Sequence, residues 1–332
     1  MGTAYRDLDE LSQVELLRTV ALAAAPQFGL EPTGVELVLH GYNTTFRLET
    51  AQRTVALRVN TNSASSPEAV EAQQEWQHAL ATQTEVLVPD PVPTLRGGYL
   101  ARVPSESVGR EVLVTASGWL PGEDLGVVGT LEQCRALGEL TAQLHDQAEL
   151  WGAAVAGRLP ALAEPLFGDS DVLTGACADD ARLAAVVRAA TARCTETFER
   201  VAAGADVLPL HADLHGGNLK WHEGRLAVFD FDDSGVGPPV LDLAISSFYL
   251  RDGDDAPERA MLEGYARRRP LPDVEPADVE ALIASRQLLL ANALLASTTA
   301  AFRADAAAYL QVTGDRLAHW LDTGRFTRAQ PG

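Results

Sequence analysis

Three side chains that carry oxygen lie close together in one otherwise apolar stretch. Asp213 is followed five residues later by Asn218, and Asp230 comes twelve residues after Asn218. Mg²⁺ prefers hard oxygen ligands, which Asn218 and Asp230 offer. Asp213, if it stays free of metal, can accept the proton of a substrate hydroxyl. A metal beside such a base is the combination that phosphoryl transfer needs, so this spacing predicts a phosphotransferase site.

The residues between these three indicate how they would meet. The loop from Asp213 to Asn218 contains two consecutive glycines, and an apolar strand, 226–229, ends at Asp230. Two strands on either side of a polar loop would bring the three side chains to one end of a small sheet. The alternative is an ordinary turn rich in Asp and Asn, which the coincidence of so many features disfavours.

The segment before this motif predicts a small β-rich lobe over residues 1–116. Apolar residues at helical spacing predict an N-terminal helix, and a proline in the first turn introduces a second one. Short β-branched runs separated by turn residues predict strands, with one hairpin turning at Gly97–Gly98. The expected helices are 8–25 and 67–82, and the expected strands are 35–40, 45–50, 54–59 and 112–116.

Residues 117–124 are rich in glycine and proline and predict a hinge between two lobes. Beyond it, residues 125–332 predict a mainly helical lobe in which 207–230 is a β-like island. Helices are expected at 131–150, 182–201, 278–299, 300–312 and 314–321.

Two sequence segments carry a family resemblance. HADLHGGN and VFDFDDSGVGPPVLDLA resemble the catalytic loop and metal-binding segment of the aminoglycoside phosphotransferase and choline kinase superfamily, and their form is most similar to bacterial stress-response Ser/Thr kinases and homoserine-kinase-like proteins. The resemblance implies an α+β, bilobal protein-kinase-like fold that uses ATP and Mg²⁺. Asp213 resembles the catalytic base, and Asn218 and Asp230 resemble the Mg²⁺ ligands. His211 and Asp242 resemble residues that support the catalytic loop.

Other polar residues of this motif keep two interpretations each. His215 could approach the γ-phosphate as a catalytic residue or simply pack the loop. Asp232 and Asp233 could bind metal, although a second acid beside the site and a helix cap explain them better. Lys220 stands at the start of a strand and is expected to point to solvent.

In the N-terminal part, LHGYNTTFRLET followed by TVALRV resembles the hairpin and third strand that cover the nucleotide phosphates in this family. Gly41 is the single glycine of this nucleotide-binding turn, and Asn43, Thr44 and Thr45 would offer backbone and hydroxyl donors to phosphate oxygens, although a plain β-hairpin fits the same residues. The segment 113–125, LVTASGWLPGEDL, fits an adenine site of backbone groups and apolar side chains. Trp119 within it is expected to pack in the core.

Arg58 occupies the place where this family usually has a phosphate-binding lysine. An arginine fork also binds phosphate and remains charged. Its expected partner is a glutamate on the following helix. Glu75 is preferred because it lies beside the buried stripe, and Glu71 and Glu68 are the alternatives.

Composition excludes some partners. The 332 residues carry a net charge of −20, which argues against nucleic acid and could attract a cationic substrate, although solubility alone also explains it. No apolar run approaches the roughly 20 residues that span a bilayer, so no membrane association is expected. Cys134, Cys177 and Cys194 have no metal-like spacing and predict reduced thiols in the cytoplasm.

The predicted function is transfer of the γ-phosphate of Mg·ATP to a hydroxyl of a small molecule, such as an aminoglycoside, choline or a homoserine-like acceptor. A Ser/Thr protein kinase of the stress-response type is the second possibility. A nucleotide-binding pseudokinase is the third, but such a protein would normally have lost the base or a metal ligand.

Overall fold

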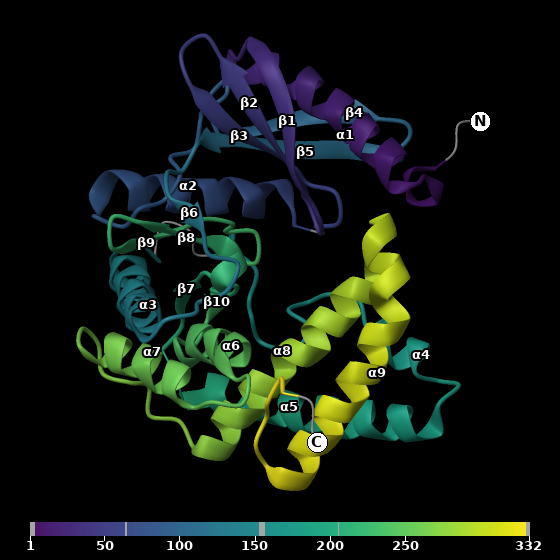
Figure 1. Cartoon of the computed structure of the whole chain (residues 1–332), viewed down its shortest axis with the longest axis vertical. Coiled ribbons are helices and arrows are strands. Elements are labelled where there is room, and N and C mark those ends of the chain that lie inside the picture. Colours follow the sequence, from purple (N-terminus) through teal and green to yellow (C-terminus); the bar gives the residue numbers. More distant parts are fainter. Residues whose placement is uncertain (1–3, 64, 153–156, 205, 330–332) are drawn as a thin grey trace.

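The computed structural model describes residues 4–63, 65–152, 157–204 and 206–329. Its first half is an antiparallel five-stranded sheet in the order β1-β2-β3-β5-β4, which lies at the top of Figure 1. The strands are β1 (Pro32–His40), β2 (Thr44–Thr50), β3 (Thr54–Val59), β4 (Leu100–Ser105) and β5 (Arg110–Gly118).

Alternating burial explains why this sheet forms. Phe46 and Leu48 of β2 and Leu57 of β3 are fully buried, whereas their neighbours along each strand are less so. Their buried faces share a core with helix α1 (Glu10–Ala24), whose first turn is capped by Asp9. The small lobe therefore has a hydrophobic core of its own.

Helix α2 (Pro67–Gln83) connects the sheet to the helical lobe and lies between them in Figure 1. Its buried Trp76 and Leu80 belong to the core of the helical lobe. Trp76 packs edge-on against Phe231, which follows Asp230 in the motif, with 5.4 Å between ring centroids. The orientation of α2 is thus fixed by the segment that carries the predicted metal ligand.

The second half of the chain is mainly helical. It contains two small β elements, a β6-β8-β9 sheet and a β7-β10 pair, with the predicted catalytic residues between them. The short strands are β6 (Glu123–Asp124), β7 (Leu208–Leu210), β8 (Leu219–His222), β9 (Arg225–Val228) and β10 (Gly235–Gly237). The helices are α3 (Leu131–Trp151), α4 (Leu173–Ala176), α5 (Ala181–Gly204), α6 (Val240–Leu250), α7 (Ala256–Ala266), α8 (Pro276–Ala296) and α9 (Ala300–Thr323).

Three details differ from the sequence-based expectations. The glycines Gly97 and Gly98 precede β4, and the β4–β5 hairpin reverses at residues 106–109. The two helices expected after residue 300 are one helix, α9, in which Gly314 makes room for Leu183 rather than ending a helix: a Cβ at Gly314 would lie 2.5 Å from the Leu183 side chain. Helix α7 was not predicted, because it is short and its buried residues are few.

Helix α8 is long and apolar enough to cross a membrane by length and composition, but 61% of its apolar window is buried inside the protein. It packs against α5, α6 and α9 at the centre of the helical lobe. Its apolar character is therefore explained by its position as a core helix. One of its polar residues, Arg286, is buried at the active site described next.

Candidate active site

The loop 211–218 is held in place by one buried carboxylate. Asp242, at the start of α6, accepts hydrogen bonds from the backbone N–H groups of His211 and Ala212, at 3.2 and 2.7 Å. Ala212 has a positive φ of 61°, an uncommon conformation that such anchoring sustains. The His211 ring lies against the carbonyl oxygen of Phe229, at 3.1 Å, and so joins the loop to the end of β9.

The two consecutive glycines of the loop have a packing reason. A Cβ at Gly216 would lie 2.5 Å from the carbonyl oxygen of Gly126, and one at Gly217 would lie 2.6 Å from the His215 ring. Glycine at position 216 allows the loop to approach Gly126, just after the hinge, and glycine at position 217 leaves room for the His215 ring. The structure thus explains Gly216–Gly217 without assigning them contact with a ligand.

Asp213 is engaged at both carboxylate oxygens. Its Oδ2 accepts a hydrogen bond from Asn218 Nδ2 at 2.8 Å and lies 3.5 Å from His215 Nε2. Its Oδ1 pairs with Arg286, which comes from α8. Burial opposes ionisation of Asp213, but the charges of Arg286 and His215 outweigh it and hold the pKa of this carboxyl below its usual range. Asp213 is therefore ionised at neutral pH.

Asn218 and Asp230 each carry a side-chain oxygen of the kind that Mg²⁺ prefers as a ligand. The amide nitrogen of Asn218 donates to the backbone and side chain of Asp213, which leaves its amide oxygen for a cation. Asp230 follows β9 with a positive φ of 67°. Among the described residues, no group of three His, Cys, Asp or Glu side chains could hold a metal ion alone. The amide oxygen of Asn218 and the carboxylate of Asp230 suit Mg²⁺ bound beside nucleotide phosphates, because such an ion usually takes only one or two protein ligands.

Arg58 does not pair with Glu75 as the sequence suggested. Its Nη1 lies 2.5 Å from Asp230 Oδ1, and its Nη2 pairs with Asp232. Glu75 instead forms a two-pronged ion pair with Arg158, at 2.9 and 2.5 Å. The expected partner was wrong because α2 turns a different face to the site. Gln73 is on that face and donates to the carbonyl oxygen of Asp232 at 2.8 Å.

The two alternative glutamates, Glu71 and Glu68, do not pair with Arg58 either. Glu71 accepts a hydrogen bond from the backbone of Tyr99 at 2.7 Å, and Glu68 lies in the first turn of α2. The carboxylates that hold the Arg58 guanidinium come from the metal-binding segment itself.

The two further acids of this segment, Asp232 and Asp233, are partly buried beside charged groups. Asp232 bridges Arg58 and Asn43, so it is an ion-pair partner in this structure. Asp233 lies 3.4 Å from Arg286. Burial, with the nearby Asp230, raises the pKa of Asp232 to about 6 despite the opposing Arg58. Burial, with the charge of Asp213, raises the pKa of Asp233 to about 7.

The polar groups of the turn between β1 and β2 were expected to be available as phosphate donors, but in the structure several of them bond to other protein groups. The Thr44 hydroxyl is fully buried and bonds to His40 at 2.8 Å. Asn43 accepts from the Thr61 backbone at 2.7 Å and donates to Asp232 at 2.5 Å. The carbonyl oxygen of Gly41 accepts from Thr299, just before α9, at 2.7 Å. The turn is therefore tied to the helical lobe at two points.

Two adjoining cavities meet at these charges and share Arg58, Asp230 and Asp232. The smaller, of about 190 Å³, lies under the sheet and is lined by residues that include Val38, Ala56, Thr115, Trp119, Lys220 and Phe229. The larger, of about 840 Å³, contains Asp213, His215 and Arg286 and extends to Tyr42, Phe302 and Tyr309. Sequence reasoning missed Arg286 because it lies in α8, far from any motif.

Lys220, the only lysine of the chain, is buried and does not point to solvent as expected. Its Nζ lies 2.7 Å from Asp124 Oδ1 and 5.6 Å from the centre of the Trp119 ring. Lys220 and Trp119 both line the smaller cavity. Trp119 is therefore part of the cavity wall and not the core residue that was expected. The strand position alone could not reveal this, because β6 and the hinge close over β8.

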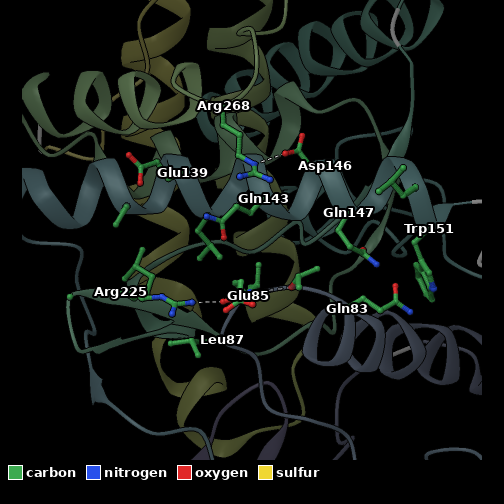
Figure 2. A pocket seen from close by; sticks show the side chains of 17 residues that line it. Gln83, Glu85, Leu87, Glu139, Gln143, Asp146, Gln147, Trp151, Arg225 and Arg268 are labelled. Atoms are coloured by element: carbon green, nitrogen blue, oxygen red, sulfur yellow. Dashed lines mark hydrogen bonds and ion pairs between the residues drawn. The ribbon is translucent and has the colours of Figure 1, made fainter.

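Another cavity, of about 640 Å³, is lined by residues of α3, of the end of α2 and the segment that follows it, and of the β8–β9 turn (Figure 2). Its arginines are engaged within the protein, Arg268 with Asp146 and Arg225 with the backbone of Glu85. None of the motif residues lines it. The chemistry therefore belongs to the cleft between the lobes.

Residues 35–279 match the model of the phosphotransferase enzyme family. The chain belongs to that family. The match includes the sheet, the hinge and both motif segments, and members of the family are kinases, so this phosphotransferase is an enzyme. The family match ends at residue 279, before most of α8 and all of α9, and both of these helices line the larger cavity.

Similar proteins agree with the fold of this phosphotransferase. An uncharacterized protein of Deinococcus radiodurans is 29% identical over 82% of this chain and 81% of its own length. A microcompartment-associated aminopropanol kinase superposes with a TM-score of 0.71, at 22% identity over 94% of this chain and 100% of its own. An amicoumacin kinase solved with AMP-PNP and Ca²⁺ has a TM-score of 0.67, at 19% identity over 90% and 93% of the two chains.

The corrected pairing of Arg58 gives a testable prediction. Arg58→Gln and Asp232→Asn should be non-additive in unfolding free energy, with a coupling of about 0.5–3 kcal/mol, because each removes the same contact. Arg58→Gln and Glu75→Gln should add to within roughly 0.5 kcal/mol. Urea denaturation in metal-free buffer measures both cycles. Coupling to Glu75 but not to Asp232 would contradict the arrangement described above.

Proposed function

We propose that this phosphotransferase transfers the γ-phosphate of Mg·ATP to a hydroxyl group of a small molecule that carries an amine. The observation that supports this most strongly is that Arg58, Asp230 and Asp232 line both cavities, while Asp213, which is hydrogen-bonded to Asn218, lines the larger one. In this proposal the smaller cavity takes the nucleotide base and the larger one takes the acceptor. The phosphates would lie between them.

The nucleotide side of the proposal rests on the size and charge of the smaller cavity. The apolar side chains in its lining suit a flat base, and Arg58, which lines both cavities, suits phosphate oxygens. Asn218 and Asp230 would hold Mg²⁺, which neutralises phosphate charge when it is bound. Asn43 and Gly41 would keep the β1–β2 turn over the phosphates through their bonds to the rest of the site.

The proposed role of Asp213 is to orient the attacking hydroxyl. Its oxygens already have fixed donors, and its low pKa makes it a weak base. It would accept a hydrogen bond from the acceptor hydroxyl and align it with the γ-phosphorus. It would take the proton of that hydroxyl as the new oxygen–phosphorus bond forms, while the bond from the γ-phosphorus to the β–γ bridging oxygen breaks and ADP leaves. Alignment of this kind accounts for much of the catalysis in phosphoryl transfer.

The acceptor side supports a cationic substrate. Asp169 and Asp233 bring carboxylates to the larger cavity, and Tyr42, Phe302 and Tyr309 bring aromatic rings. Carboxylates and ring faces both attract an ammonium group. The names of the aminopropanol and amicoumacin kinases concern those proteins, but amine-bearing alcohols are a reasonable first set of acceptors for this one.

A protein acceptor is the second candidate, supported by one observation. Stress response kinase A of Escherichia coli is 40% identical to this chain over 78 residues, which is 24% of this chain and 20% of the curated relative. This short match concerns a minor part of that kinase. A protein acceptor therefore belongs in the same assay as the small molecules.

The first test is phosphotransfer from ATP to a panel of amino alcohols, their amine-free analogues and a casein-like protein. We expect transfer to amino alcohols, and Asp213→Asn should lower kcat by about 10²–10⁴-fold while the thermal shift caused by Mg·ATP persists. Transfer only to the protein would support the second candidate. Full turnover by Asp213→Asn would contradict the role given to Asp213.

The amine claim has a test of its own. Asp169 is half-buried at the larger cavity, and its burial raises the pKa of its carboxyl. Asp169→Asn should raise the KM of an amino alcohol roughly 10–100-fold, the range for a lost charged hydrogen bond, and should leave the KM of an amine-free acceptor unchanged. Asp171→Asn is the matched control, because exposed Asp171 caps Thr174 outside the cavity. Equal effects on both acceptors would argue against an amine contact at Asp169.

A further inference from the structure

Arg286 is the most deeply buried charge in the cleft. It lies in α8, beyond the end of the family match, and only 3% of its surface is exposed. Its guanidinium faces three groups from other elements: Asp213 of the catalytic loop, Asp233 after Asp232, and Tyr249 at the end of α6. A buried arginine with this many partners is costly to desolvate, so its position is a specific feature of the site.

The contacts of Arg286 close a ring of four side chains. Arg286 Nη2 pairs with Asp213 Oδ1 and also donates to the Tyr249 hydroxyl at 3.1 Å. The Tyr249 ring stacks on the His215 ring, with 4.2 Å between centroids and 20° between planes. His215 Nε2 returns to Asp213 Oδ2 at 3.5 Å. The ring thus joins the catalytic loop to α6 and α8.

The same face of α8 lines the acceptor cavity. Leu289, Leu290, Ala293 and Leu294 follow Arg286 at three- and four-residue steps, and all of them line the larger cavity. Residues at that spacing share one side of a helix. Any shift of α8 relative to the catalytic loop would therefore move the acceptor wall and the Arg286 contact together.

We propose that Arg286 is a positioning residue for phosphotransfer: it holds the Asp213 carboxylate from the helix that also walls the acceptor cavity. Asn218 fixes one carboxylate oxygen and Arg286 fixes the other, so the plane of the carboxylate is set only when both are present. Arginine suits this task because its planar fork reaches Asp213, Asp233 and Tyr249 at once. This inference rests on the function proposed above.

The test measures kcat and KM for ATP with an amino alcohol that the panel identifies. Arg286→Gln should lower kcat by about 10²-fold, the cost of a small misplacement of a catalytic group, and change the KM for ATP little. Arg286→Lys should recover part of the loss, because charge returns without the fork. Because Arg286 acts through Asp213, the Asp213→Asn/Arg286→Gln double variant should be no slower than Asp213→Asn alone.

Arg251 provides a matched control. It is a buried arginine, 6% exposed, that pairs with Glu258 and Glu280, and it does not line either cavity of the cleft. Arg251→Gln should lower stability yet leave kcat within a few-fold of the wild type. A kcat loss in Arg251→Gln as large as that in Arg286→Gln would overturn the proposal, because loss of any buried ion pair would then suffice.

Other results also decide the matter. Wild-type kcat in Arg286→Gln, with Asp213→Asn inactive, would overturn the proposal and leave the proposed function standing. A double variant slower than Asp213→Asn by the full Arg286→Gln factor would show that Arg286 acts apart from Asp213, which also overturns it. An active Asp213→Asn removes both claims. If Arg286→Gln fails to fold, Tyr249→Phe decides instead: a selective fall in kcat supports the ring, and an unchanged kcat contradicts it.

Discussion

The structure depends on the close approach of four partly buried carboxylates in one cleft. Asp213, Asp230, Asp232 and Asp233 repel one another in a partly desolvated space, where like charges interact strongly. Arg58 from the sheet and Arg286 from α8 approach this cluster from opposite sides and pair with all four. Four carboxylates against two guanidinium groups leave an excess of negative charge in the cleft when all four acids are ionised. The remaining negative charge favours binding of further cations, a metal ion among the phosphates and an amine on the acceptor.

The same cluster explains how the two lobes are joined. Arg58 of β3 pairs with Asp230, and Asn43 of the β1–β2 turn donates a hydrogen bond to Asp232. On the other side of the cleft, Asn62 accepts from Thr298, and Thr299 donates to Gly41. The β1–β2 turn is thus connected both to Asp232 and to the segment just before α9.

How much the sequence could predict follows from how local each signal is. Asp213, Asn218 and Asp230 were predicted as site residues from spacing because one short segment carries all three, and the small sheet was predicted from short β-branched runs separated by turn residues. The Arg58 partner was missed because helix rotation decides it, and several glutamates fit the stripe of α2 equally well. Arg286 and the inward position of Lys220 were missed for a different reason: each depends on a contact between distant elements, α8 with the loop and the hinge with β8, that no local pattern encodes.

The most direct test of this account is the effect of Mg²⁺ on ATP binding, measured by titration calorimetry. If residual negative charge governs the cleft, ATP alone should bind weakly, because its phosphates add to the acids. Mg²⁺ should tighten binding by about tenfold or more, equivalent to roughly 1.4 kcal/mol, and Asp230→Ala should remove most of that gain. Equal affinity for ATP with Mg²⁺ and with a chelator, in the wild-type protein, would contradict the account.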